Sequence, residues 1–147
     1  MKKQLDLSSE KNCACLNVRR AARVITQVYD AEVRRHGIRP TQTSILATLQ
    51  AKGVWGMAEL SDRLGMDRTT LVRNLRPLQR DGLARASGGG RGGYVELTIT
   101  EKGRKALTKV LPAWSSAQKK VVATLGPERW SAIMSDLEQV EGKLKLQ

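Results

Sequence analysis

The sequence lacks several features that define other classes of protein. It contains no phenylalanine, two cysteines and one histidine among its 147 residues. Two cysteines are too few for a disulfide-stabilised scaffold, and a single histidine without clustered acidic or thiol ligands argues against a metal centre. No phosphate-cradling glycine loop follows a predicted parallel strand. We therefore expect no enzyme, no metal and no cofactor.

Long apolar segments are also missing. No run approaches the roughly 20 apolar residues of a membrane-spanning helix, and the polar start MKKQLDLSSEK lacks the apolar core of a signal peptide. Cys13 and Cys15 stand about 200° apart if both lie on one helix, so they cannot bridge each other there without unwinding it. These observations predict a protein of the reducing cytoplasm with no membrane partner.

Acidic residues are scarce relative to basic ones. There are 26 Lys and Arg residues against 14 Asp and Glu residues, which gives a formal net charge of +12. Such an excess favours a polyanionic partner, of which nucleic acid is the commonest soluble kind. The length and the apolar content of 40% fit one domain with its own core.

The stretch from Gly56 to Gly82 predicts two short helices joined by a tight turn. Gly65 provides the turn because it tolerates positive φ, and Asp67 is the expected N-cap of the second helix. Apolar residues recur every three or four positions in both helices, so each has one inward face. The inward residues are Met57, Leu60 and Leu64 in the first helix and Leu71, Leu75 and Leu78 in the second.

The second of these helices has an outer face that starts with the small residue Thr69 and is basic beyond it, at Arg73, Arg76 and Arg80. This pattern predicts a helix-turn-helix whose second helix enters a DNA major groove. The alternative is a solvated helix that uses arginine for solubility. Pro77 lies within this helix, where we expect a kink or a local widening near Arg73 and not a stop.

A basic β-hairpin is predicted after Gly82. Leu83–Ala86 forms one strand, and the alternating pattern of Val95–Ile99 forms the second. The glycine-rich loop between them contains Arg91, which suits the negative potential of an A·T-rich minor groove. The alternative is a surface loop in which Arg91 is incidental.

Amphipathic helices are predicted at both ends of the chain. The first begins at Ser8 or Ser9 and ends at Gly37, and the last begins at Pro127. Each has an apolar stripe that needs another element or another subunit to cover it. The stripes comprise Cys15, Val18, Ala22, Ile25 and Tyr29 in the first helix, and Trp130, Ile133, Leu137, Val140 and Leu144 in the last.

Three intervening segments complete the prediction. A helix begins at Thr41 or Thr43 after Pro40 and runs to Gly53. The dipeptide Val54-Trp55 is too short for an independent strand but can pair with the hairpin. Thr100 caps a further helix, which Pro112 kinks or splits.

This order of elements resembles the MarR family of bacterial transcriptional regulators. The stretches LSDRLGMDRTTLVRNLRPLQRDGLARA and LTITEKGRKAL are similar to that family's helix-turn-helix, wing and exit helix. The resemblance implies a mainly α fold with a small β-hairpin wing. The winged helix-turn-helix lobe spans residues 41–100, and residues 8–37 and 101–147 form the helical dimerisation region.

The resemblance also implies a homodimeric repressor that binds a pseudo-palindromic double-stranded operator and is released by a small-molecule effector or by oxidation. An architectural DNA-binding protein without effector or strong sequence preference is the alternative. By position, the implied DNA-binding residues are Arg68, Thr69, Thr70 and Arg73 in the major groove, Asn74 and Arg76 at the backbone, and Arg91 at the wing tip. Gly90 stands where the family usually has an acidic residue.

The N-terminal helix is similar in spacing to the organic-peroxide-sensing OhrR branch, in which a cysteine and a tyrosine fourteen positions later interact. The corresponding residues are Cys15 and Tyr29, with Cys13 as an additional thiol. Fourteen helical residues span about 21 Å, so that contact must cross a dimer. Two alternatives remain: Cys15 is simply a small packed residue, or the effector is an anionic aromatic or carboxylate ligand.

Overall fold

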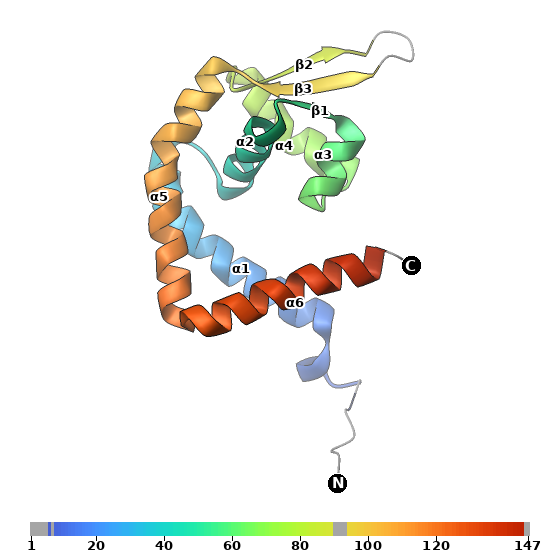
Figure 1. Cartoon of the computed structure of the whole chain (residues 1–147), viewed down its shortest axis with the longest axis vertical. Coiled ribbons are helices and arrows are strands. Elements are labelled where there is room, and N and C mark those ends of the chain that lie inside the picture. The colour runs from blue at the N-terminus through green and yellow to red at the C-terminus, as the bar shows by residue number, and fades with distance from the viewer. Residues whose placement is uncertain (1–5, 7, 90–93, 146–147) are drawn as a thin grey trace. The chain divides into compact units, whose positions relative to one another are not determined.

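The computed structural model describes residues 6, 8–89 and 94–145. Within those ranges the chain has six α-helices, two short 3₁₀ helices and one three-stranded sheet (Figure 1). The chain divides into two compact units. One comprises residues 32–114, and the other combines the described residues up to Ala31 with those from Ser115 onward. The helices are α1 (Ala14–Val33), α2 (Pro40–Lys52), α3 (Met57–Leu64), α4 (Arg68–Arg80), α5 (Glu101–Leu125) and α6 (Pro127–Lys145).

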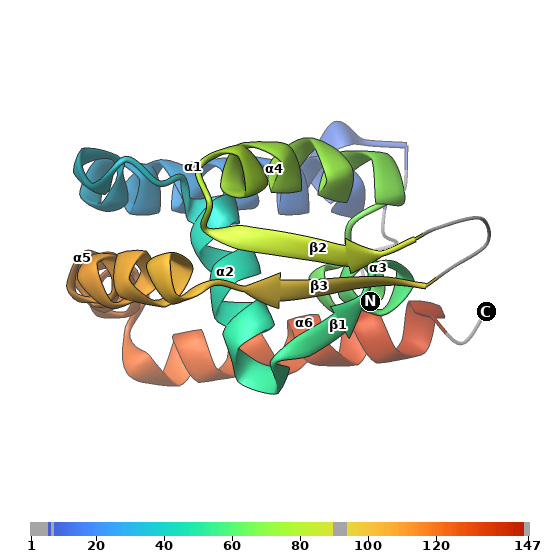
Figure 2. The same cartoon turned by 90° about the horizontal axis from the view of Figure 1, so that it is seen from above.

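The sheet belongs to the unit of residues 32–114 and is antiparallel throughout. Its strands are β1 (Val54–Gly56), β2 (Ala84–Gly88) and β3 (Val95–Ile99), and β3 lies between the other two (Figure 2). The predicted hairpin is therefore confirmed, with β2 extending two residues past Ala86. The short segment at Val54 does pair with it, opposite Thr98.

One hydrophobic core holds this unit together. Alternation along β3 buries Leu97 and Ile99, while helical spacing buries one face each of α2, α3 and α4. Each fully buried Leu or Ile is worth about 1.5–3 kcal/mol relative to an exposed one. The most deeply buried large side chains include Ile45, Leu46, Leu49, Leu60, Leu71, Leu75, Leu78 and Leu97.

The first helix begins later than predicted. Residues Glu10–Asn12 form a 3₁₀ turn, Cys13 has extended backbone, and α1 starts at Ala14. The side chain of Ser9 makes no cap bond, whereas Cys13 Sγ accepts from the Leu16 backbone N–H at 3.4 Å. Cys13 thus occupies the capping position, and the two cysteines do not share a helix. At the other end, the 3₁₀ turn Arg34–His36 comes between α1 and Gly37. Such turns are frequent at the ends of α-helices.

Prolines mark two further differences. Pro40 is the first residue of α2, and the Arg39 backbone N–H donates to Gln42 Oε1 at 2.9 Å. The predicted start at Thr41 or Thr43 was therefore late, because proline fits the first helical position. Pro112 does not split α5, which is continuous from Glu101 to Leu125, and Val110 and Ala113 beside the proline are buried. As predicted, Pro77 does not stop α4.

Candidate nucleic-acid interface

The helix-turn-helix forms as predicted, because its turn and cap are local interactions. Gly65 has φ 61° and its N–H donates to Asp62 O at 3.1 Å, while the Met66 N–H donates to Ser61 O at 2.9 Å. These bonds satisfy carbonyls at the end of α3. The left-handed backbone here favours glycine, which explains the sharp turn into α4.

Asp67 caps the N-terminus of α4. Its carboxylate accepts from the Thr70 backbone N–H at 2.8 Å and from the Thr70 hydroxyl at 2.7 Å. The hydroxyl, followed by the N–H, lowers the pKa of Asp67. The Thr70 hydroxyl therefore donates within the chain, so any contact of this predicted DNA-binding residue with DNA needs its methyl group or its hydroxyl lone pairs.

The two faces of α4 differ sharply in exposure. Leu71, Leu75 and Leu78 are at most 1% exposed. The opposite face exposes Arg68, Thr69, Arg73, Arg76 and Arg80. Asn74 is half-buried and its side-chain amide donates to Thr70 O at 2.9 Å, which directs it toward its own helix. The structure thus brings together all six α4 residues predicted to bind DNA.

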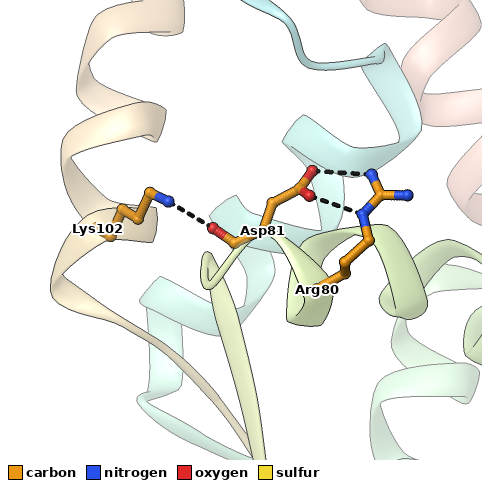
Figure 3. Close-up of polar contacts among 3 residues, drawn as sticks. All are labelled: Arg80, Asp81 and Lys102. Carbon is orange, nitrogen blue, oxygen red and sulfur yellow. Dashed lines mark hydrogen bonds and ion pairs between the residues drawn. The ribbon is translucent and has the colours of Figure 1, made fainter.

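Arg80 differs from the other arginines of α4, for which the described part of the chain shows no acidic partner. Its Nε donates to Asp81 Oδ1 at 2.8 Å and its Nη2 to Asp81 Oδ2 at 3.3 Å (Figure 3). The Arg80 guanidinium, assisted by the charge of Lys102, lowers the pKa of Asp81. Among the described residues, the positive charge of α4 that has no acidic partner therefore lies at Arg68, Arg73 and Arg76.

The C-terminal end of α4 is joined to the start of α5. Lys102 Nζ donates to Asp81 O at 2.8 Å, and the Thr100 hydroxyl donates to Gly82 O at 2.6 Å. Thr100 Oγ1 also accepts from the Gly103 N–H at 3.0 Å, which confirms Thr100 as the cap of α5. Periodicity alone identified neither Asp81 nor Lys102, because it describes the direction of a side chain and not its partner.

The wing is described on both sides of its tip. Strands β2 and β3 pair from Ala84 opposite Ile99 to Gly88 opposite Val95. Gly90 and Arg91 lie outside the described residues, so the role of Arg91 remains a prediction.

The predicted sensor residues have different environments. Cys13 and Cys15 are both exposed, which gives an oxidant access to either thiol. Tyr29 is only 8% exposed, and its hydroxyl donates to Gln118 Oε1. Burial raises the pKa of Tyr29. Gln118 was not predicted as a partner, because no sequence pattern links residues so far apart.

Neither metal nor membrane features emerge from the described part of the chain. Within residues 6, 8–89 and 94–145, no three His, Cys, Asp or Glu side chains gather to hold a metal ion. In the same ranges, no helix has the length and apolar character needed to cross a bilayer.

Comparison with known proteins identifies structural relatives. A scan of family models gives no match, and a search of curated proteins gives none either. Among solved structures, the M. tuberculosis transcriptional regulator MosR, in complex with DNA, is 38% identical to this chain. The match covers 91% of this chain and 97% of MosR, with a TM-score of 0.80.

Two more distant structures share the fold. A MarR-family regulator from Silicibacter pomeroyi is 19% identical, covers 99% of both chains and has a TM-score of 0.72. Bordetella bronchiseptica BpsR, described with regulation of its DNA binding by 6-hydroxynicotinic acid, is 17% identical with a TM-score of 0.79. That match covers 91% of this chain and 97% of BpsR.

Proposed function

The chain belongs to the MarR family of transcriptional regulators, and from this we propose that it is a homodimeric repressor that binds a specific DNA operator. The observation that supports this most directly is α4, a helix capped by Asp67 with a buried leucine face and an exposed arginine face. DNA bound to MosR supports the same partner for this chain. We assign it no catalytic step and a cytoplasmic location, where its operator is accessible.

We assign roles along α4 from exposure and chemistry. Arg68, Thr69 and Arg73 read bases in the major groove, because arginine pairs bidentately with guanine and threonine contacts the thymine methyl. Arg76 holds the phosphate backbone, which fixes the register of the helix on the duplex. Asn74 contacts the same backbone through the second hydrogen of its amide, since the first is donated to Thr70 O. Arg91 enters the flanking minor groove.

Exposed apolar side chains support a dimer. In α1 they include Leu16 and Val18, and in α6 they include Ile133, Leu137 and Val140. Apolar faces of this extent on two helices favour association with a second copy. A two-fold dimer places two α4 helices about one DNA turn apart, which matches a pseudo-palindromic operator.

We further propose that an effector or oxidant releases the operator. Both thiols are exposed, and thiolate oxidation passes through a sulfenic acid that condenses with a second thiol. An anionic aromatic or carboxylate ligand is the other input, as the regulation of BpsR by 6-hydroxynicotinic acid suggests. Either input acts by shifting the population of the DNA-competent dimer.

Selection of operators from a random duplex library tests the DNA-binding proposal. We expect the chain to prefer a selected pseudo-palindrome over random duplex by at least about a thousandfold at physiological salt. Equal affinity for all duplexes would support an architectural DNA-binding protein instead.

Release of the selected operator then tests the signal. Hydroperoxides and aromatic carboxylates are titrated into complexes of the wild type and of the Cys13→Ser and Cys15→Ser variants. Oxidative sensing predicts release of the wild type and loss of release in at least one variant. Release by a carboxylate in all three proteins supports the ligand, and no release by hydroperoxide rejects the redox role.

A further inference from the structure

Tyr94 stands directly before β3, where pairing stops on both sides of that strand. On one side, β1 ends at Gly56, opposite Glu96. On the other, β2 ends at Gly88, opposite Val95. Residues two apart on a strand share a face, so Tyr94 is the diagonal neighbour of Gly56, a position within reach of an aromatic side chain.

The ring of Tyr94 lies on Gly56. A methyl group placed on Gly56 would overlap the phenol oxygen and lie 2.5 Å from Cζ and 3.0 Å from Cε1, and these are its three nearest atoms. Gly56 is also the N-cap residue of α3. The missing side chain at this position thus leaves room for the ring at the first turn of the helix-turn-helix.

A second glycine accommodates the backbone of the same tyrosine. Gly88 has φ 80°, and a methyl group placed on it would overlap the Tyr94 carbonyl oxygen. Tyr94 is therefore held against Gly56 through its ring and against Gly88 through its main chain.

Burial does not explain this arrangement, because the Tyr94 residue is 70% exposed. A tyrosine side chain has only two torsions, so holding it in place costs little conformational entropy. An aromatic ring that covers a cross-strand glycine also stabilises the register of a sheet. The contact therefore orients the outer end of the hairpin relative to α3.

We propose that Tyr94 is a positioning residue for the wing, and that its ring on Gly56 sets where the wing meets DNA flanking the α4 site. This rests on the proposed DNA-binding function. Tyr94 is the described residue that leads into β3, so the contact of its ring with Gly56 anchors this end of the strand. An end of β3 that is held before DNA binds does not need to be ordered on contact.

The test compares affinities for two duplexes that contain the selected operator with either A·T-rich or G·C-rich flanks. Tyr94→Ala is expected to weaken binding to the A·T-flanked duplex about tenfold, the size of one lost contact, and to remove the preference between flanks. Tyr94→Phe retains the ring and should stay within about twofold of the wild type. Val54→Ala, on the same face of β1, is the matched control and should keep the preference.

A double-mutant cycle links the effect to Gly56. Gly56→Ala should reproduce the loss in the wild type, because its methyl group displaces the ring, and should add little in the Tyr94→Ala background. Thermal unfolding confirms that each variant is folded.

Four results would overturn the positioning role: no loss in Tyr94→Ala, an equal loss on both flanks, a loss in Tyr94→Phe as large as that in Tyr94→Ala, or additive effects of the two substitutions. If the wild type shows no sequence preference at all, the proposed DNA-reading function itself fails.

Discussion

Arg73 is one of the α4 side chains that we propose to read a base. It is exposed two positions after the buried Leu71, and no intramolecular acceptor is recorded for it among the described residues. Arg73→Ala should weaken operator binding by about 1–3 kcal/mol and relax the base preference at one position of each half-site. Binding to a library of single-base operator variants measures both effects.

Arg80→Ala is the matched control for Arg73. It lies seven residues further along the same face, but its guanidinium is paired with Asp81. We expect a smaller loss of affinity and an unchanged base preference. If the sequence preference of Arg73→Ala equals that of the wild type, Arg73 contacts only phosphates.

Gly103 and Gly142 provide a second comparison of single residues. Both lie inside α-helices, but a methyl group on Gly103 would overlap the Leu83 carbonyl oxygen and lie 2.8 Å from Ile99 Cγ1. Gly103→Ala should therefore lower the free energy of unfolding by about 1–3 kcal/mol. Urea unfolding at a fixed protein concentration measures this change.

Gly142→Ala should have the opposite sign. No atom lies within 4 Å of a methyl group placed there, so the substitution removes the entropic cost of glycine in a helix. We expect stabilisation of about 0.5–1 kcal/mol if the position stays open in the dimer. Destabilisation of a purified dimer by Gly142→Ala would instead place Gly142 at a close subunit contact.

At the scale of elements, the cap of α4 makes stability depend on pH. Hydrogen bonds from Thr70 lower the pKa of Asp67 in the folded state below its ordinary value of 3.8. The ionised carboxylate therefore contributes stability above pH 3.8, and this contribution is lost as the pH falls through the folded-state pKa.

The melting temperatures of the wild type and Asp67→Ala should differ by a constant amount from about pH 5 to pH 7. The difference should shrink as the pH falls below about 4. The pKa of Asp6, Glu59 and Asp81 is also lowered, but these carboxylates are common to both proteins, so the comparison isolates Asp67. A difference that stays constant down to pH 2 would show that the carboxylate charge does not stabilise the cap.

Elements that depend on local chemistry were predictable from the sequence. The turn at Gly65 and the helix caps at Asp67 and Thr100 depend on hydrogen bonds to residues three positions away, and the inward leucines of α4 follow from helical period alone. Such features predicted the helix-turn-helix and the residues on its outer face.

Features that depend on distant or competing partners were not predictable in the same way. The pairing of Arg80 with Asp81 is local, yet helical period describes only the direction of a side chain and not its partner. The hydrogen bond from Tyr29 to Gln118 and the contact of the Tyr94 ring with Gly56 join residues that are far apart in the sequence. Only the folded chain brings them together. The late start of α1 reflects a capping thiol at Cys13, a residue type that capping preferences omit.

At the scale of the whole molecule, the formal charge of +12 predicts strong salt dependence of DNA binding. Each phosphate neutralised by Lys or Arg contributes about −0.9 to the slope of log K against log salt concentration. Arg76→Ala removes one phosphate contact from each subunit, and so two from the proposed dimer, which should reduce that slope by about 1.8. An unchanged slope would exclude Arg76 from the phosphate contacts.

The proposed dimer gives the sharpest test at this scale. Leu137 lies in the apolar seam of α6 and is 40% exposed in the single chain. Leu137→Glu places a charge in the proposed interface, where it cannot be solvated, so the dimer should dissociate at micromolar concentration. Sedimentation equilibrium measures the mass, and operator binding measures the consequence.

Ser135→Glu is the matched control for this charge. Ser135 is exposed and lies two residues earlier, about 200° around the helix and away from the seam. This variant should remain dimeric and retain operator affinity, whereas the Leu137→Glu monomer should bind only single half-sites. The two subunits of a dimer bind the two half-sites of the operator together. Separating the subunits therefore reduces the affinity for the operator by about a hundredfold or more. Full operator affinity in a monomeric Leu137→Glu protein would contradict binding of the operator by two α4 helices, one from each subunit.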